Sequence, residues 1–274
     1  MKRLLLFVAL ILTLMTIPAF PQDIGVRLAM VNIPSDLVRP LLPGFLQETG
    51  IHAKIVYTGN DPFTEARAGR ADLVISHYGH EGVEAFVTGG WGLWPHTVFA
   101  NQMVLLGPAA DPAGVRGIYD AAEAFRHIAA SKSRFLSNNS AGAKYLEKIL
   151  WISADVRDKG DWYMDLKSQG PQAMHQAAAR GAYMLWGLPP FLRQKRHGRF
   201  DLEPLVVQDP ILQRIMVSIV VNPAKVPSAN SAGARAFQNY LLAPATQARI
   251  RKFRYPGFAF QAWWPAGRHN NAHD

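Results

Sequence analysis

Short apolar runs alternate with amphipathic stretches along most of the chain, which is the pattern of strands followed by helices. Residues 26–31, 71–76 and 98–107 are apolar enough to form buried strands. After the first run, apolar side chains recur at helical spacing from Leu37 to Leu46, and two prolines inside this stretch predict a short or kinked helix. The alternation predicts an α/β fold with mainly parallel sheets flanked by helices.

The same pattern predicts the remaining elements. Helices are expected over residues 62–68, 81–88, 118–129, 142–151, 171–180, 232–242 and 244–253, and strands over 51–57, 134–137, 181–186, 202–207 and 214–222. Two chain crossings, near residues 101–107 and 208–222, predict a two-lobed molecule with a hinge and a ligand cleft between the lobes. We expect lobe 1 to contain residues 20–105 and 210–274, and lobe 2 to contain residues 106–209.

Ligands of open α/β sheets bind where the carboxyl ends of strands meet the amino ends of helices. Four predicted loops meet this condition: residues 32–36, 76–81, 137–142 and 186–190. The cleft is therefore expected between these loops.

The first residues have the three parts of a secretory signal peptide. Lys2 and Arg3 precede an apolar run from Leu4 to Ile17, and Ala19 offers a small residue for cleavage. A cleavable signal peptide over residues 1–19 is the favoured interpretation, and a retained membrane anchor is the alternative. The chain has no cysteine, which excludes a lipoprotein anchor and thiol chemistry. Together these features predict a protein of the Gram-negative periplasm.

The chain is basic, with 29 Lys and Arg against 20 Asp and Glu and a net charge of +9. Loss of the signal peptide removes two of these positive charges and no acidic residue. The strongest basic runs, residues 193–199 and 249–254, lie outside the predicted cleft loops and read as solvated faces. Neither run has the interleaved aromatics of a nucleic-acid site, so no nucleic acid is expected as a partner.

Motifs of common catalytic sites are missing from the sequence. There is no G-x-S-x-G, Walker or H-E-x-x-H motif and no Rossmann glycine fingerprint, so we predict neither an enzyme nor a bound cofactor. His77, His80 and Glu81 form the densest group of possible metal ligands. We favour local capping of a strand–helix junction for this group, with a metal-binding protein centred on His77 and His80 as an alternative.

A polar stretch from Ser137 to Ser140 opens the predicted helix at 142–151. Hydroxyls, side-chain amides and free backbone N–H groups at a helix start can hold an anion or a polar ligand. An ordinary helix cap explains the same residues equally well.

Several ordered stretches resemble the periplasmic tungstate-binding proteins of ABC transporters, which have the type II periplasmic-binding-protein fold. The stretch most similar to the family is residues 104–115. Residues 68–77, 178–183, 220–225 and 241–247 are also similar, and all five stretches occur in the same order as in the family. The resemblance covers roughly residues 25–265. It implies a monomeric two-lobed protein that closes on a small solute or oxyanion and delivers it to the membrane permease of an ABC importer.

The ligand site departs from the family pattern. The family has a first loop rich in Thr and Ser, whereas residues 28–32 here read Leu-Ala-Met-Val-Asn. Asn138 stands where the family has an arginine, and residues 186–190 replace a second arginine-bearing loop. Because a small dianion needs many donors or a cation, tight tungstate binding is not expected.

We therefore hypothesise a more neutral or more apolar solute in the same cleft, with Arg214 as a substitute cation. The expected ligand contacts come from all predicted cleft loops and the second crossing: Asn32, Ser35, His77, Tyr78, Ser137, Asn138, Asn139, Ser140, Trp186 and Arg214. The alternative at the level of function is a ligand-sensing or accessory periplasmic protein on the same fold.

Overall fold

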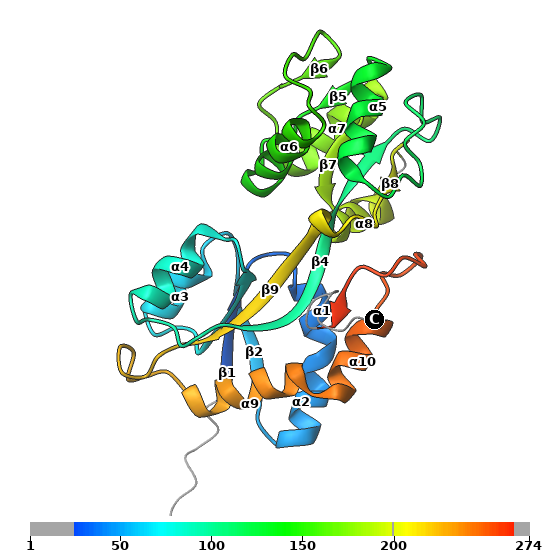
Figure 1. Ribbon diagram of the computed structural model, residues 1–274. Helices are drawn as coiled ribbons and strands as arrows, with labels where there is room; N and C mark the ends of the chain where they lie inside the picture. Colours follow the sequence, from blue (N-terminus) through cyan, green and yellow to red (C-terminus); the bar gives the residue numbers. More distant parts are fainter. Residues whose placement is uncertain (1–24, 199, 266–274) are drawn as a thin grey trace, which may run out of the picture.

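Two lobes connected by two long strands form the molecule (Figure 1). The computed structural model describes residues 25–198 and 200–265, so the predicted signal peptide lies outside the described residues. Within the described part of the chain, no helix combines the length and the apolar character needed to cross a membrane.

Lobe 1 is built on one mixed sheet with strand order β10-β4-β9-β3-β1-β2. Strands β1, β2 and β3 pair in parallel, as predicted, and β9 pairs antiparallel with both β3 and β4. The elements of this lobe are β1 (Val26–Met30), α1 (Ser35–Val38), η1 (Arg39–Leu41), α2 (Leu42–Thr49), β2 (Ala53–Thr58), α3 (Pro62–Arg67), β3 (Leu73–His77), α4 (Glu81–Thr88), β9 (Gln213–Val220), α9 (Ser231–Leu242), α10 (Pro244–Lys252) and β10 (Trp264–Pro265).

The sheet of lobe 1 carries helices on both faces, because side chains alternate across its strands. Phe63 of α3 and Phe86 of α4 pack on one face with Val74 of β3. Phe45 of α2 and Phe237 of α9 pack on the other face, with ring centroids 5.0 Å apart. The two helical layers bury the apolar strands that the sequence predicts.

Lobe 2 has a smaller core around a short parallel group. Strands β5 and β6 pair in parallel, and a parallel bridge joins Phe135 to Tyr183. Phe125, Phe135 and Trp151 pack together in this core. Its elements are α5 (Ala121–Ala130), β5 (Phe135–Leu136), α6 (Ala141–Ser153), β6 (Tyr163–Met164), α7 (Gly170–Arg180), β7 (Met184–Gly187), α8 (Leu188–His197), β8 (Glu203–Val206) and η2 (Pro210–Leu212).

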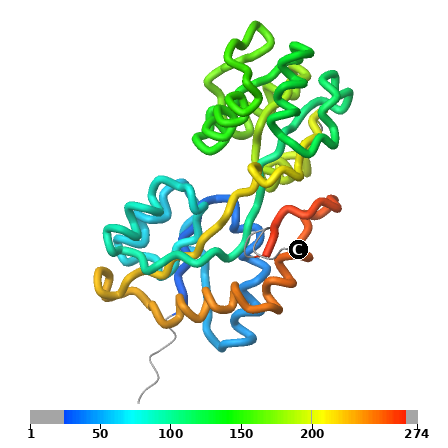
Figure 2. Tube along the Cα trace, viewed as in Figure 1, coloured from blue at the N-terminus to red at the C-terminus, as the bar shows by residue number. Residues whose placement is uncertain are grey.

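Strand β4 (His96–Gly107) belongs to both lobes. It pairs with β9 from His96 to Gln102 and with β7 from Met103 onward. Figure 2 shows β4 and β9 running side by side between the lobes. Strand β4 pairs antiparallel with β7, β8, β9 and β10. The sequence predicts mainly parallel sheets, so the observed sheets contain more antiparallel pairs than expected.

Two proline-rich stretches show how well the sequence defines local structure. The predicted kinked helix is confirmed, since α1, η1 and α2 follow one another over residues 35–49, and Gly50 ends α2 with a φ of 70°. The predicted loop at residues 186–190 is wrong. Strand β7 continues to Gly187 and α8 starts at Leu188, with its prolines in the first turn, where a missing N–H costs no helical hydrogen bond.

Candidate functional site

The two crossing strands bring Arg214 and His77 together beside the hinge. Arg214 lies on β9 opposite Asn101 of β4, and His77 ends β3 opposite Met216 of β9. Burial and, to a smaller extent, the positive charge of Arg214 together lower the pKa of His77 to about 3, against an opposing hydrogen bond with Asn101. His77 is thus a neutral ring beside a cation near pH 7.

Arg214 is a largely desolvated cation with no counter-charge. Burial lowers the pKa of its guanidinium, and within residues 25–198 and 200–265 no carboxylate pairs with it and no hydrogen bond satisfies it. A desolvated charge is unfavourable unless an opposite charge compensates it. The surroundings of Arg214 therefore favour an anion.

The amino end of α6 reaches the same place from lobe 2. A Cβ atom on Gly142 would lie 3.0 Å from a terminal nitrogen of Arg214, so the guanidinium of β9 approaches the backbone of the first turn of α6. Ser140 precedes this turn and its side chain makes no capping hydrogen bond. The first N–H groups of a helix have no intrahelical acceptor, and they carry partial positive charge. Arg214 and α6 together form a site that is complementary to an anion and contacts both lobes.

Ser137 and Asn138 lie inside lobe 2 and use their polar atoms there. The Ser137 hydroxyl donates to Glu147 Oε2 at 2.7 Å and accepts from Lys144 Nζ at 2.7 Å. Asn138 donates to the Leu185 carbonyl and accepts from the N–H groups of Ser140 and Gly170. Both side chains are almost fully buried, and they fold the loop that positions α6. Their polar atoms are therefore already paired within lobe 2, and the proposed ligand site does not include them.

Asn139 and Trp186 are also engaged within the fold. Asn139 Nδ2 donates to Asp165 Oδ1 at 2.9 Å. Trp186 is buried on β7 within the core that joins the two lobes. Since these side chains are engaged within the fold, the proposed ligand site does not include them either.

The first predicted loop offers little to a ligand. The hydroxyl of Ser35 donates to the carbonyl oxygen of Asn32 at 3.0 Å, which closes the turn before α1. Asn32 is exposed at the start of this turn. Tyr78 is 65% exposed beyond the end of β3, and its backbone N–H donates to the Ile215 carbonyl. Asn32 and Tyr78 are thus accessible to a ligand, whereas the hydroxyl of Ser35 is hydrogen-bonded to the backbone.

His80 caps helix α4, as the favoured interpretation of the sequence has it. Its Nδ1 accepts from the Gly82 N–H at 3.1 Å, and its Nε2 lies 2.9 Å from the Asn60 carbonyl oxygen. Both ring nitrogens are therefore engaged, which leaves no lone pair for a metal. Among the described residues, no group of three His, Cys, Asp or Glu side chains could hold a metal ion.

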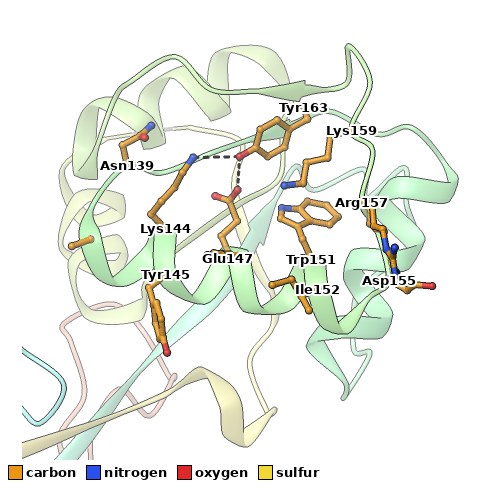
Figure 3. A pocket seen from close by; sticks show the side chains of 13 residues that line it. Asn139, Lys144, Tyr145, Glu147, Trp151, Ile152, Asp155, Arg157, Lys159 and Tyr163 are labelled. Carbon is orange, nitrogen blue, oxygen red and sulfur yellow. Dashed lines mark hydrogen bonds and ion pairs between the residues drawn. The ribbon is translucent and has the colours of Figure 1, made fainter.

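Sequence patterns did not reveal a charged network behind α6 (Figure 3). Lys144 Nζ donates to Asp165 Oδ2 at 3.1 Å, and the Tyr163 hydroxyl donates to Glu147 Oε1 at 2.6 Å. Burial and the hydrogen bond to Glu147 raise the pKa of Tyr163. The hydrogen bond from Asn139 is the largest cause of a lowered Asp165 pKa. The spacing of Lys144 and Glu147 shows that they are neighbours on a helix, but only the fold brings in their partners Tyr163 of β6 and Asp165, which follows β6.

Two lobes, two crossing strands and a cation at their junction define a class of protein, namely the two-lobed solute-binding proteins that close on a ligand. The chain belongs to the bacterial extracellular solute-binding protein family, whose model matches residues 26–255. This membership confirms the resemblance found in the sequence.

Individual relatives agree with the family. The tungstate-binding protein TupA of Peptoclostridium acidaminophilum is 30% identical over 223 residues, which cover 80% of this chain and 77% of that protein. The structure of the tungstate-binding protein TupA from Desulfovibrio alaskensis G20 is similar with a TM-score of 0.75 and 29% identity, over 89% of this chain and 99% of that one. The tungstate ABC transporter structure from Geobacter sulfurreducens has a TM-score of 0.70 and 27% identity, over 84% and 99% of the two chains.

Proposed function

We propose that this protein captures a small oxyanion between its lobes and delivers it to an ABC importer. The observation that carries the proposal is Arg214, a desolvated guanidinium on the crossing strand without an anionic partner in the described chain. Relatives that bind tungstate support the choice of an oxyanion. Arg214 favours an anion over the more neutral solute that the loss of the family's arginines suggests.

In this proposal the ligand acts as a bridge between the lobes. Arg214 of β9 supplies the charge, and the first turn of α6 supplies backbone N–H donors next to Gly142. His77 is held neutral by burial and by Arg214, so it adds no second positive charge beside the ligand. Because the ligand contacts both lobes, its binding shifts the molecule toward the closed form.

The wider setting is proposed with the site. We infer a periplasmic protein released by signal cleavage near residue 19, monomeric, without catalytic activity, and recognised in its closed form by a permease. The lobes are proposed to divide near residues 105 and 210. A sensor or accessory protein on the same fold would use the same closure. Finding genes for a permease and an ATPase beside the gene of this chain would favour the importer.

Calorimetric titration with tungstate, molybdate, sulfate and phosphate tests the proposal. We expect saturable binding of at least one of these oxyanions, and a loss of about tenfold to a hundredfold in affinity for Arg214→Met, since charge-assisted hydrogen bonds are lost. Arg235→Met, which changes an exposed arginine on α9, is the matched control and should bind like the parent protein.

Gly142→Ala adds a second arm to this experiment. The new Cβ would crowd the guanidinium of Arg214, so we expect weaker anion binding without a loss of stability, because Ala is the better helix former. If Arg214→Met binds every oxyanion as tightly as Arg235→Met does, the proposed site is wrong.

A further inference from the structure

A pocket lies along helix α6 in lobe 2 (Figure 3). It has a volume of about 710 Å³ and runs along α6 and the following segment to β6. Pockets of this size hold small organic ligands. Its lining combines apolar side chains with cations. A ligand with an apolar part and an anionic part would match both.

Lys159 is a cation of this pocket that forms no ion pair or hydrogen bond within the described residues, although Glu147 lies near enough to interact with its charge. Its ammonium lies 4.6 Å from the ring centre of Tyr163 and 5.3 Å from that of Trp151. In the described part of the chain it makes neither an ion pair nor a hydrogen bond, whereas Lys144 donates to Ser137, Tyr163 and Asp165. Burial lowers the pKa of Lys159, and the charge of Glu147 opposes this effect only in part.

Trp151 provides a second unused donor on the pocket wall. Its side chain is 2% exposed, and its indole N–H is buried without a hydrogen-bond partner. In Figure 3 the indole nitrogen lies on the side of Lys159 and Glu147. Buried donors are almost always paired in folded proteins, so an unpaired N–H on a pocket wall indicates a ligand with an acceptor.

The charge balance of the pocket favours an anionic acceptor. The Glu147 carboxylate accepts hydrogen bonds from Ser137 and Tyr163, and Lys144 interacts favourably with it. Asp155 lies 3.6 Å from Arg157, which leaves Lys159 and the exposed Lys148 as the surplus positive charges. Ile152, 67% exposed, and the partly buried Val156 provide apolar surface next to these charges.

The pocket reaches Ala141 at the start of α6, but the groups proposed to hold its ligand lie far from that end. Trp151 follows Gly142 by nine residues on α6, which places it about 14 Å further along the helix axis. Arg214 does not line the pocket. A ligand held by Lys159 and Trp151 would therefore contact other groups than the oxyanion proposed for the cleft.

We propose that this pocket binds a small organic carboxylate with an aromatic or branched apolar body. The carboxylate accepts hydrogen bonds from the Lys159 ammonium and the Trp151 indole N–H, and the body packs on Ile152 and Val156. A neutral analogue of the same shape lacks the charge that Lys159 requires.

Benzoate is a suitable probe, with benzamide as its neutral counterpart, in calorimetric titrations of the full mature chain. We expect benzoate to saturate with a dissociation constant of about 1 mM or tighter, and benzamide to bind about tenfold more weakly. Lys159→Met keeps the aliphatic stem and removes the charge, so it should weaken benzoate binding about tenfold. Trp151→Phe keeps an apolar ring and removes the N–H, and it should weaken binding severalfold.

Two control variants separate this proposal from the cleft. Lys225→Met changes another lysine that lies over a tryptophan, at 5.7 Å from the ring of Trp91, and should leave benzoate binding unchanged. Arg214→Met should abolish only the cleft site. The pocket proposal is overturned if benzoate does not saturate, if benzamide binds equally well, or if Arg214→Met rather than Lys159→Met removes benzoate binding. Thermal melting of each variant confirms that it is folded.

Discussion

At the scale of single residues, the neighbourhood of Arg214 explains the site better than the chemistry of any one side chain. A histidine at the end of a strand is an ordinary feature of a sequence. Here burial and the adjacent guanidinium keep His77 neutral, and its pKa of about 3 depends on Arg214, which is 137 positions away in the chain. Asn138 is predicted to bind a ligand, but its side chain forms hydrogen bonds with the backbone of Leu185, Ser140 and Gly170 instead.

The lowered pKa of His77 predicts an acid-sensitive fold. In the folded protein this pKa is about 3, well below the ordinary value of 6.5, so between these values the unfolded chain binds more protons than the native one. Stability attributable to His77 is thus fully present above about pH 6.5 and is lost as the pH falls toward 3. We expect His77→Gln to show a smaller drop in melting temperature between pH 7 and pH 5 than the parent protein.

Differential scanning calorimetry at closely spaced pH values measures this effect. His52→Gln is the control, because His52 is exposed on the loop before β2, and it should follow the parent protein. An unchanged pH profile in His77→Gln would mean that His77 titrates normally in the folded protein.

At the scale of elements, the proposed site lies at strand–helix junctions. Helix α6 presents its first turn to Arg214, and β3 ends at His77 on the other side. Helix α4 begins at a histidine cap rather than at a ligand site, because both nitrogens of His80 are engaged. The same type of junction therefore serves either a ligand or the fold, according to whether its polar atoms have partners.

The cap of α4 gives a prediction that separates structure from metal binding. His80→Ala removes the acceptor for the Gly82 N–H and should lower the free energy of unfolding by about 1 kcal/mol. His80→Asn should recover part of this loss, since Asn is a good capping residue. Urea unfolding with and without a chelator measures both effects. A loss of stability in the parent protein on adding chelator, absent in His80→Ala, would restore the metal alternative.

At the scale of the whole molecule, one side of the hinge is packed and the other holds the site. A continuous apolar core extends from α2 and α9 in lobe 1 to α7 and α8 in lobe 2. Arg193 of α8 lies 3.4 Å from Asp36 of α1, which adds an ion pair across the same side. The closure proposed above would then be a rotation about β4 and β9, with the packed side as the pivot.

This geometry predicts a measurable compaction. Saturating oxyanion, whichever of the four binds in the titrations, should reduce the radius of gyration in small-angle X-ray scattering, because the ligand draws α6 toward β9. Arg214→Met at the same ligand concentration should keep the ligand-free radius, and Arg235→Met should compact like the parent protein. Equal radii for the parent protein with and without bound ligand would show that binding does not close the lobes.

The sequence by itself determined the order and type of most elements, the two crossings and the family. Apolar periodicity is a local signal, so α4 was predicted at its observed bounds and α2 was predicted to end at Gly50. The prolines at the start of α8 led to a wrong prediction of a loop. Proline is common both in loops and in the first turn of a helix, and the local sequence does not distinguish the two.

Only the tertiary structure decided which polar residues are free. Ser137, Asn138 and Asn139 look like ligands in the sequence because their hydrogen-bond partners lie up to 47 positions away in the chain. Arg214 and Lys159 are candidates for binding an anion because the fold desolvates both and gives neither an ion pair in the part of the chain that the structure describes. The identity of a residue is written in the sequence, but its burial and its partners are properties of the folded chain.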